Sequence, residues 1–412
     1  MNIWIFNENA YAPDMPGGTR HYDFAHELVK LGHEVSIFAK SFHHHRHQEL
    51  RLSKGEKWKV EEINGVRFVW IRTPPYYKNN WRRAWNHMVY TFRIWNLGRK
   101  ITTYNPDLQK PDVIIGSSPH LFTPFAAYHL SKSFHVPFIM EVRDLWPQVL
   151  IDLNSSFACY PIIKPLQILE KSLYFKSHSL IILGPQMRKH MNSIGLADSR
   201  IHWIPNGVNL NPKELSNQEI KFHSSDKFII MYLGAHGYNN SMNSLLFSAK
   251  IIQDSGFSSI SFVLIGDGPE KDELIKISRN LKLNNLNFYD PVPKSDVQKV
   301  LSQSNVLFVS AKPTFINSGG SLNKLSDYMA AAKPIIFAIN TEYNPVDESH
   351  CGLTIPPENP DAIVDAIKHL YYLTEGERNE MGLNGRKYVK DHHDTSILVK
   401  KLEKILIEAV SS

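Results

Sequence analysis

The residues best suited to chemistry lie between positions 317 and 334, where the chain reads NSGGSLNKLSDYMAAAKP. Gly319 and Gly320 let the backbone approach a ligand closely, and Ser321 is a candidate N-cap for the helix expected after them. The free amide groups and the dipole of a helix N-terminus favour phosphate, and Lys324 in the first turn adds a positive charge. The pattern therefore predicts an anion site. The alternative is an ordinary crossover helix with a flexible entry.

Two further glycine-rich turns are expected at the same edge of the predicted sheet. One follows the strand expected at 228–233 and reads GAHGYNNSMNS; the other follows the strand expected at 261–265 and reads GDGPEKDEL. In an open parallel sheet, ligands bind in the crevice outside the carboxyl ends of the strands. Three such turns in one sheet favour a phosphate-binding crevice more than any one of them does.

Polar residues also follow the strands expected in the first half of the chain. The stretch PGGTRHYDFAHELVKL does not match GxGxxG, but Gly17 and Gly18 can still bring backbone amides and Arg20 toward an anion. Two later strands end in further polar residues: Ser117, Ser118 and His120, and then Glu141, Arg143 and Asp144. These side chains could line the crevice, and each taken alone could equally be a capping or salt-bridge group.

The elements that must position these residues alternate between short apolar runs and amphipathic stretches, which predicts α/β domains with parallel sheets covered on both faces. Asn64-Gly65, between apolar runs at 58–63 and 66–71, predicts a hairpin. Polar residues at 211–226 predict a linker between two domains. The other expected strands are 2–6, 33–39, 112–116, 137–142, 179–183, 286–289, 306–309 and 335–338, and the last helices are 361–373, 379–391 and 396–410.

The segment from 76 to 105 differs in composition from the rest of the chain, because it holds many aromatic and basic residues and no acidic ones. Trp81, Trp85, Met88, Phe92 and Trp95 recur at helical spacing. Indole rings favour the headgroup level of a membrane and arginines pair with lipid phosphates, so a helix over 81–100 is expected to bind the inner-membrane surface. The alternative is that the aromatic stripe packs on the domain core and the arginines are solvated.

The composition is that of an ordinary globular protein, with 412 residues, 42% of them hydrophobic, and a formal charge of +6. This length suits two domains, and the charge indicates anionic partners. No run of about 18 apolar residues and no charged leader occurs, so a cytoplasmic protein without a membrane span is expected. Cys159 and Cys351 do not suggest a disulfide framework or a metal cluster, and the histidine-rich stretch 42–47 is expected to be a polar loop with metal binding a minor possibility. No nucleic-acid-binding fingerprint accompanies the basic charge.

Three stretches together, IPNGVN at 204–209, IGDGP at 265–269 and NKLSDYMAAAKPI at 323–335, resemble the retaining family 4 glycosyltransferases of the GT-B fold. The resemblance extends over nearly the whole chain and includes EVRDLWPQ at 141–148. It is strongest to bacterial O-antigen and capsule transferases that move N-acetyl-fucosamine or N-acetyl-quinovosamine from UDP to a lipid-linked acceptor.

The resemblance implies two Rossmann-like domains that face a cleft, with the last helix crossing back to the first domain. An acceptor-binding domain is expected at 1–205 together with 393–412, and a nucleotide-sugar-binding domain at 206–392. The acceptor is expected to be a polyprenyl-diphosphate-linked sugar. The UDP-sugar is a substrate, so no cofactor is expected, and no clustered Asp-x-Asp is present to bind a metal.

The resemblance also implies roles for particular residues. Lys324, Asp327 and His120 are the expected catalytic residues, with Lys324 contacting the diphosphate and Asp327 the ribose or sugar. The acceptor side is expected to include Gly17, Gly18, Arg20, Arg143 and Asp144. The donor side is expected to include Gly234, His236, Asn243, Gly266, Asp267, Gly268, Gly319, Gly320, Ser321, Asn323, Lys324 and Asp327.

The chain departs from the family pattern at several positions. The family's two glutamates, seven residues apart, would fall on Gly319 and Asp327, so the first is missing and the second is shortened. The Arg and Lys often found after the first strand of the nucleotide domain are absent from GAHGYNNSMNS, where His236 and Asn243 are the polar candidates. The family's histidine does not align cleanly, although His120 lies nearby.

Three functions from different classes remain open on the sequence. The first is a membrane-associated UDP-sugar-dependent transferase with retention, in which Lys324 and a helix N-terminus stabilise the leaving diphosphate, which can itself accept the acceptor's proton. The second is a non-catalytic nucleotide-sugar-binding protein, because a glutamate is missing. The third is a UDP-sugar epimerase on the same architecture.

Overall fold

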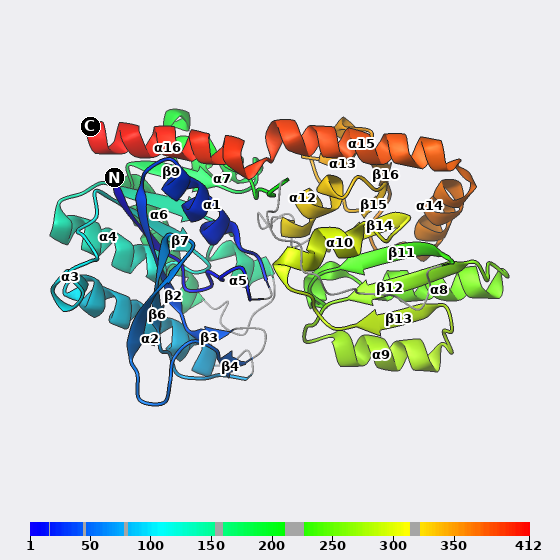
Figure 1. Ribbon diagram of the computed structural model, residues 1–412, viewed down its shortest axis with the longest axis horizontal. Helices are drawn as coiled ribbons and strands as arrows, with labels where there is room; N and C mark the ends of the chain where they lie inside the picture. Colours follow the sequence, from blue (N-terminus) through cyan, green and yellow to red (C-terminus); the bar gives the residue numbers. More distant parts are fainter. Residues whose placement is uncertain (16, 44–46, 78–80, 153–159, 211–225, 314–321) are drawn as a thin grey trace.

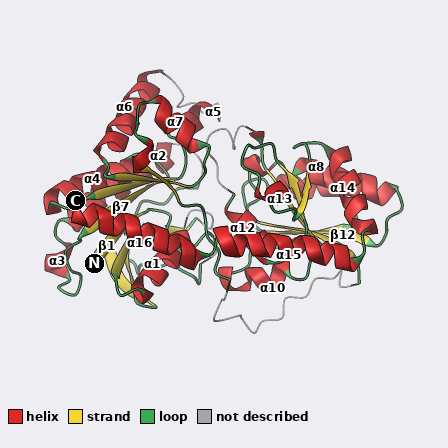
Figure 2. Ribbon diagram, turned by 90° about the horizontal axis from the view of Figure 1, so that it is seen from above, coloured by secondary structure: helices red, strands yellow, loops and turns green. Residues whose placement is uncertain are grey.

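The computed structural model describes residues 1–15, 17–43, 47–77, 81–152, 160–210, 226–313 and 322–412 (Figure 1). Two sheets stand side by side, each covered by helices on both faces (Figure 2). The helix α15 (Glu375–His392) lies over the second sheet, and α16 (Thr395–Ser411) runs back over the first (Figure 1). The expected GT-B architecture of two Rossmann-like sheets, with a last helix that crosses back, is therefore confirmed.

The first sheet has eight strands in the order β10-β9-β8-β7-β1-β2-β6-β5. All neighbours are parallel except β5 and β6, which pair antiparallel through the hairpin predicted at Asn64-Gly65. Both turn residues have positive φ, 51° and 81°, as a tight two-residue hairpin requires. The strands are β1 (Asn2–Phe6), β2 (Glu34–Lys40), β5 (Trp58–Ile63), β6 (Val66–Ile71), β7 (Val113–Ser118), β8 (Phe138–Val142), β9 (Ser179–Ile182) and β10 (Ile201–Trp203).

Two separate apolar cores lie on the two faces of this sheet. On one face, α1 (Arg20–Lys30) and α16 bury Phe24, Leu28 and Leu402 against the strands. On the other face lie four helices whose apolar side chains, including Tyr90 and Leu173, form the second core. These helices are α2 (Trp81–Gly98), α4 (Phe122–Phe134), α6 (Tyr160–Lys176) and α7 (Met187–Ser193). Short elements complete this half: β3 (Phe42–His43), β4 (Gln48–Glu49), α3 (Ile101–Tyr104), α5 (Gln148–Asp152) and η1 (Asp198–Arg200).

The second sheet has six parallel strands in the order β13-β12-β11-β14-β15-β16. These are β11 (Phe228–Leu233), β12 (Ile260–Ile265), β13 (Leu286–Tyr289), β14 (Val306–Ser310), β15 (Ile335–Ala338) and β16 (Gly352–Thr354). One face carries α8 (Asn243–Asp254), α9 (Lys271–Asn280) and α14 (Pro360–Tyr372). The other carries α10 (Val297–Leu301), α12 (Asn323–Ala330), α13 (Pro345–Glu348) and α15, with η2 (Tyr238–Asn240) and η3 (Lys294–Asp296) in the loops.

The predicted strands and the helices expected at 361–373 and 396–410 occur within one or two residues of their expected bounds, because long apolar runs and amphipathic periods are strong signals. The helix expected at 379–391 begins four residues earlier, at Glu375. The strands β10 and β16 were not predicted, because they are three-residue strands at sheet edges and too short to show a period. The expected linker at 211–226 lies almost entirely outside the described residues, so the domain boundaries stay a prediction. None of the described helices combines the length and the apolar character that crossing a bilayer needs.

Candidate active site

A cavity of about 410 Å³ lies between the two halves of the molecule, at the carboxyl ends of both sets of parallel strands. From the first half it is lined by Gly17, Gly18, Thr19, Arg20, Asp23, His43 and Arg143. From the second half it is lined by Asn206, Gly207, Leu233, Gly234, Ala235, Asn240, Ile265, Gly266, Asp267, Pro291, Val292, Lys294, Val297, Leu322, Lys324 and Asp327. The cavity therefore brings together many of the residues that the sequence placed on either side of a cleft.

Glycines allow the backbone to form the walls of this cavity. Gly266 has φ +145°, and a Cβ there would lie 1.9 Å from the carbonyl oxygen of Gly234, so the turns after β11 and β12 cross without room for a side chain. On the opposite wall, Gly17 has φ +128°, and a Cβ would lie 2.7 Å from the ring of Tyr11. Since L-residues rarely adopt such φ values, these turns need glycine.

The helix α12 carries Lys324 into the cavity beside the ends of β11 and β14. The helix begins at Asn323 with Leu322 in the cap position, and no side chain caps it. The expected cap, Ser321, and the pair Gly319 and Gly320 lie outside the described residues, as does the side chain of Asn323. The contribution of the turn amides before α12 therefore stays a prediction.

Lys324 is bound only by neutral groups among the described residues. Its Nζ donates to the hydroxyl of Tyr232 at 2.6 Å and to Oδ1 of Asn240 at 2.9 Å, and it lies 4.2 Å from the centre of the Tyr232 ring. Burial lowers the pKa of Lys324 to about 7, because no carboxylate among the described residues compensates for the lost hydration. A partly buried amine whose described partners are all neutral is suited to bind an anion that enters the cavity.

Asp327, one turn further along α12, is paired with a lysine that the sequence reading did not identify. Lys294 Nζ donates to both carboxylate oxygens of Asp327 at 2.6 Å. Burial acts to lower the pKa of Lys294, but Asp327 and Asp23 hold it above its ordinary value. The cavity thus holds two lysines in opposite states, since Lys294 is neutralised by carboxylates and Lys324 is not.

Asp23 reaches the same cavity from α1 in the first half of the chain. Its Oδ2 accepts a hydrogen bond from the Thr19 hydroxyl at 2.7 Å, and Lys294 across the cavity attracts its charge. Burial nevertheless raises the pKa of Asp23 to about 6. A carboxylate from the first half of the chain therefore faces the lysines of the second half.

Arg20 lines the cavity, but its guanidinium is already engaged. Nε donates to Oε1 of Glu141 at 2.8 Å, and the two terminal nitrogens donate to the backbone carbonyls of Ile204 and Pro205. Glu141 also accepts from His21 at 2.7 Å and from the Ser117 hydroxyl at 2.5 Å. Arg20, Glu141 and Ser117, three of the polar residues that follow predicted strands, therefore belong to one buried hydrogen-bond network. Arg143 lines the cavity, whereas Asp144 does not.

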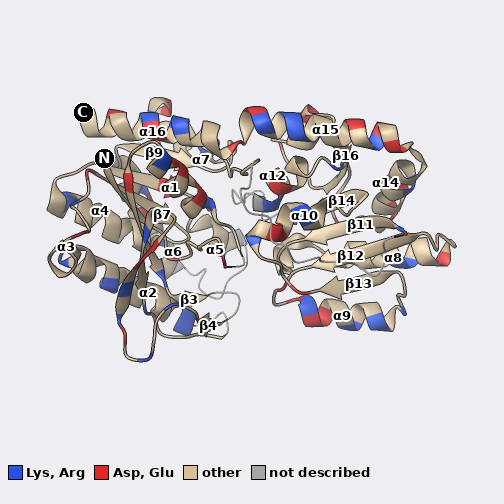
Figure 3. Ribbon diagram, in the orientation of Figure 1, with Lys and Arg blue, Asp and Glu red and all other residues tan. Residues whose placement is uncertain are grey.

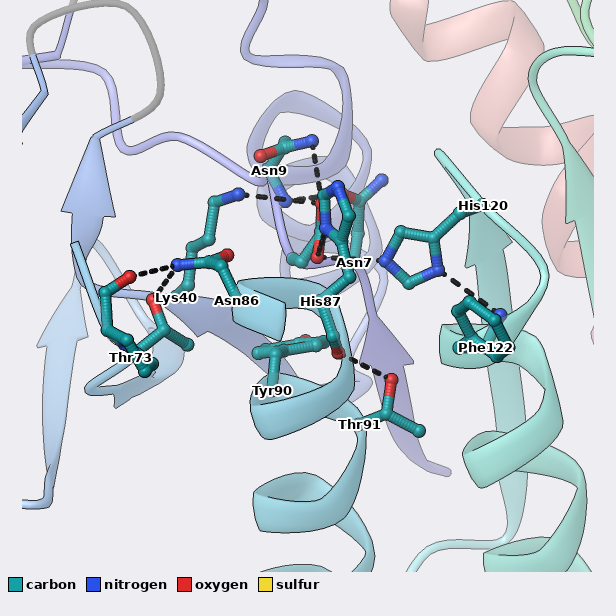
Figure 4. Close-up of polar contacts among 12 residues, drawn as sticks. Asn7, Asn9, Lys40, Thr73, Asn86, His87, Tyr90, Thr91, His120 and Phe122 are labelled. Atoms are coloured by element: carbon teal, nitrogen blue, oxygen red, sulfur yellow. Dashed lines mark hydrogen bonds and ion pairs between the residues drawn. The ribbon is translucent and has the colours of Figure 1, made fainter. Parts of the chain in front are cut away.

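His120, expected to be catalytic, lies in a second buried network centred on Glu8 (Figure 4). Its Nε2 donates to Glu8 Oε2 at 2.9 Å, and His87 from α2 donates Nδ1–H to the same oxygen at 2.8 Å. The other carboxylate oxygen accepts from Lys40 at 3.4 Å. Although burial opposes it, these partners hold the pKa of Glu8 well below its ordinary value. His120 is 1% exposed and does not line the cavity, so its catalytic role stays a prediction.

The side chains of Glu8, His87 and His120 place three potential metal-ligand atoms within 4.8 Å of one another. The amide of Phe122 donates to His120 Nδ1 at 3.1 Å, which puts the proton of this imidazole on Nε2, the nitrogen that faces Glu8 (Figure 4). A ligand nitrogen needs a free lone pair, and the ammonium of Lys40 adds positive charge beside the carboxylate. The arrangement suits a hydrogen-bonded network better than a metal site.

Two profiles of known families together match most of the chain. The Glycosyl transferase 4-like domain matches residues 17–207, and Glycosyl transferases group 1 matches residues 214–388. The chain belongs to the family 4 glycosyltransferases. No curated protein is similar enough in sequence to match it.

Solved structures share the fold of this glycosyltransferase at low sequence identity. Sucrose-phosphate synthase from Thermosynechococcus elongatus has a TM-score of 0.74 at 15% identity, over 99% of this chain and 98% of that one. Anabaena Alr3699/HepE in complex with UDP-glucose has a TM-score of 0.68 at 11% identity, over 99% and 100%. WaaG, a glycosyltransferase involved in lipopolysaccharide biosynthesis, has a TM-score of 0.66 at 15% identity, over 98% and 99%.

Several residues that the sequence proposed for this glycosyltransferase lie outside the cavity. His236 is fully buried beside Tyr232 and Phe288, neither ring nitrogen has a partner among the described residues, and burial lowers its pKa to about 4. Asn243 is exposed and lines a separate pocket, and Gly268 packs against the backbone of His236. Their roles in donor binding stay predictions that the cavity does not support.

The residues missed by sequence reasoning are those whose importance depends on a distant partner. Tyr232 and Asn240 are more than 80 residues away in sequence from Lys324, which they bind. Lys294 is 33 residues away from its partner Asp327. The one sequence signal that could have identified Asn240 and Lys294 is their location after the ends of predicted strands. Asn240 lies in the glycine-rich turn after β11, and Lys294 follows β13, so both come after strand ends of the predicted crevice.

Proposed function

We propose that this glycosyltransferase moves a sugar, with retention, from a UDP-sugar to a lipid-linked acceptor at the inner face of the cytoplasmic membrane. The observation that carries the donor part is Lys324, a partly buried amine in the cavity whose described partners are all neutral. The diphosphate of the donor supplies the missing anion. The Anabaena protein of similar fold was crystallised with UDP-glucose, which supports a uridine nucleotide.

In this proposal, the chain contributes charge stabilisation and positioning. As the glycosidic bond breaks, negative charge grows on the diphosphate, and the ammonium of Lys324 stabilises that charge in a site that excludes water. The diphosphate oxygen then accepts the proton of the acceptor hydroxyl on the face where the new bond forms, which retains the configuration. Such a step needs no metal ion.

The acceptor part of the proposal rests on α2. Its core-facing side chains are Asn86, Tyr90, Ile94 and Leu97, whereas Trp81 and Phe92 on the other side are each 63% exposed. Trp85, Met88 and Trp95 are exposed as well, so the alternative in which the aromatic stripe packs on the core is wrong for these five residues. Exposed indoles on a helix without acidic residues fit an anionic membrane surface, where a polyprenyl-diphosphate-linked sugar would be presented.

A narrower proposal for the transferred sugar is a deoxyaminosugar of the N-acetyl-fucosamine type, which would place the reaction in O-antigen or capsule synthesis. It is supported by the resemblance of the stretch at 323–335 to transferases of such sugars. The cavity volume of about 410 Å³ is within the range of small-molecule sites.

Two measurements test the proposal. A thermal-shift screen with UDP, GDP, ADP and dTDP identifies the base, and UDP is expected to raise the melting temperature most, because a ligand that binds only the folded state stabilises it. The purified protein is then incubated with UDP-sugars, with and without polyprenyl-diphosphate-linked sugar.

Release of UDP that depends on the lipid acceptor supports transfer. Binding of UDP-sugars with no turnover under any condition would instead favour the non-catalytic alternative. Conversion of the sugar without an acceptor would favour the epimerase.

A further inference from the structure

The outward face of α6 carries apolar side chains that no described element covers. Ile168 is 62% exposed and Phe175 is 43% exposed. Ile168 and Phe175 are seven residues apart, which places them on one side of the helix. Isolated exposed apolar residues need no explanation, but Ile168 and Phe175 lie in register on the side of α6 away from the buried Leu173 and Tyr174, and this pair forms the apolar stripe of α6.

This stripe lies in the same helical layer as the aromatic face of α2. The helix α4 packs against both α2 and α6, and Lys176 of α6 lies 5.2 Å from the ring of Tyr128 on α4. Phe125 of α4 is also exposed. The three helices cover the same face of the first sheet, with α4 in contact with both of the others, so their outward sides lie on the same side of that sheet.

Charge distinguishes this layer from the opposite face of the same sheet. The helices α2 and α4 contain no acidic residue, and the only one on α6, Glu170, is buried and bonded to His190 at 3.0 Å. The opposite face mixes both signs, with Lys30 paired to Glu27 on α1 and Lys404 near Glu408 on α16 (Figure 3). Exposed cations on or beside the three helices include Arg82, Arg99, Lys132, Lys164, Lys171 and Lys176.

We propose that α6 is a second membrane-binding helix, so that the acceptor half lies on an anionic bilayer through the whole outward face of α2, α4 and α6. This rests on the proposed membrane docking of α2 and extends it. The partner is an anionic lipid surface, because the exposed charge of the layer is positive and its apolar side chains can enter the interface. A single helix leaves the protein free to roll about that helix, whereas two anchored helices fix a plane. The second helix therefore sets how the cavity faces the membrane.

The test is binding of the full-length protein to phosphatidylglycerol–phosphatidylcholine vesicles at 0.15 M and 0.5 M salt. The variant Ile168→Ser with Phe175→Ser is compared with the wild type, with Trp81→Ala/Trp85→Ala on α2, and with Tyr372→Ser/Leu383→Ser on the second half as a control. Each α6 side chain adds apolar burial in the interface, so the α6 variant is expected to bind roughly tenfold more weakly at both salt concentrations. The control is expected to bind like the wild type.

A second measurement uses a fluorescent probe on α6 and does not need the double serine variant. An environment-sensitive fluorophore at Ile168→Cys, in a Cys159→Ser background, is expected to shift to the blue on addition of vesicles, while the same probe at Leu383→Cys is not. Cys351 is fully buried and should remain unlabelled.

The inference fails if the α6 probe does not shift, or the α6 variant binds normally, while the α2 variant loses binding; docking through α2 would then stand alone. It also fails if analytical ultracentrifugation shows a dimer that the α6 variant abolishes, because a second copy would then cover this face. UDP affinity is independent of both results, so a failure of the donor proposal is recognised separately.

Discussion

The two sheets carry buried ionisable groups at equivalent points, yet in opposite states. In each sheet the strand order reverses at one place, between β1 and β7 in the first and between β11 and β14 in the second, and ligands of such sheets bind at that place. In the first sheet, Glu8 and His120 follow those strands. Glu8 accepts hydrogen bonds from His120, His87 and Lys40. In the second, Lys324 has only neutral described partners.

In the proposed function the second half binds an anion at Lys324, whereas the anion of the first half, Glu8, belongs to the folded structure itself. The charge of Glu8 is balanced inside the protein, so its network contributes to the folded state. No described side chain balances the charge of Lys324, and burial lowers its pKa to about 7, so part of the free energy of a bound diphosphate would come from restoring a full charge there. Removing the charge of Glu8 should therefore lower the free energy of unfolding, whereas removing the charge of Lys324 should weaken UDP binding.

The largest effect is expected from Glu8→Gln. Removing this carboxylate leaves Lys40 buried without its anionic partner, and losing one member of a buried ion pair costs about 3–5 kcal/mol. Urea denaturation should show that loss in the free energy of unfolding, whereas Glu380→Gln on the exposed side of α15 should change it little. The folded variant should keep its UDP affinity. A clear loss of UDP affinity with unchanged stability would mean that Glu8 contributes to ligand binding, as Lys324 is expected to do.

Lys324→Ala is expected to act on binding. Loss of a charge-assisted hydrogen bond should weaken UDP binding by about 1.5–3 kcal/mol in calorimetry. Lys312→Ala, in the same half of the chain and outside the cavity, is the matched control and should bind UDP normally. If both variants bind like the wild type, the phosphates lie elsewhere in the cavity.

The pH dependence of UDP binding tests the charge state of Lys324. In the free protein Lys324 has a pKa near 7, and a bound diphosphate raises it, so binding takes up a proton. Above pH 7 the UDP affinity should therefore fall, with a limiting slope of about tenfold per pH unit, equivalent to about 1.4 kcal/mol. Calorimetry between pH 7 and 9 measures this. Lys324→Arg should flatten the profile, because arginine stays charged over this range, and an equally steep profile in that variant would assign the effect to another group.

The smallest effect is expected from Asp23→Asn. At pH 7 this carboxyl, with a pKa of about 6, is mostly ionised and places negative charge in the cavity that would hold the diphosphate. Its removal should strengthen UDP binding by about 0.5–1 kcal/mol in calorimetry, the size of a partly screened charge interaction. Weaker binding in this variant would show that Asp23 holds Lys294 in place for the ligand.

Local sequence signals were sufficient to predict the alternation of strands and helices, the hairpin at Asn64-Gly65 and the glycine turns that bring Gly234 and Gly266 to the cavity. These features depend on neighbouring residues or on a backbone conformation that glycine alone adopts easily. The position of Lys324 in the first turn of a helix after a buried strand was predictable for the same reason, although that helix begins at Asn323, later than the expected cap implied.

Side-chain partnerships could not be predicted from the sequence. His120 and Lys324 both follow strands of a parallel sheet, and nothing local shows that His120 meets Glu8 across 112 positions. The pairing of Lys294 with Asp327 also depends on the packing of two separate segments. The aromatic helix shows the same limit, since its period predicted an amphipathic α2 without showing which of its sides packs on the core.

Arg20 connects the cavity to the segment between the two sheets. It follows the turn of Gly17 and Gly18, and its guanidinium holds the carbonyls of Ile204 and Pro205, just before Asn206 enters the cavity wall. The turn of Gly17 and Gly18 and the segment at Ile204 and Pro205 are therefore held by one planar cation. Arg20, Ile204 and Pro205 all precede Asn206, so a rotation that pivots at or beyond Asn206 would carry the Gly17–Gly18 turn and residues 204–205 together as one piece.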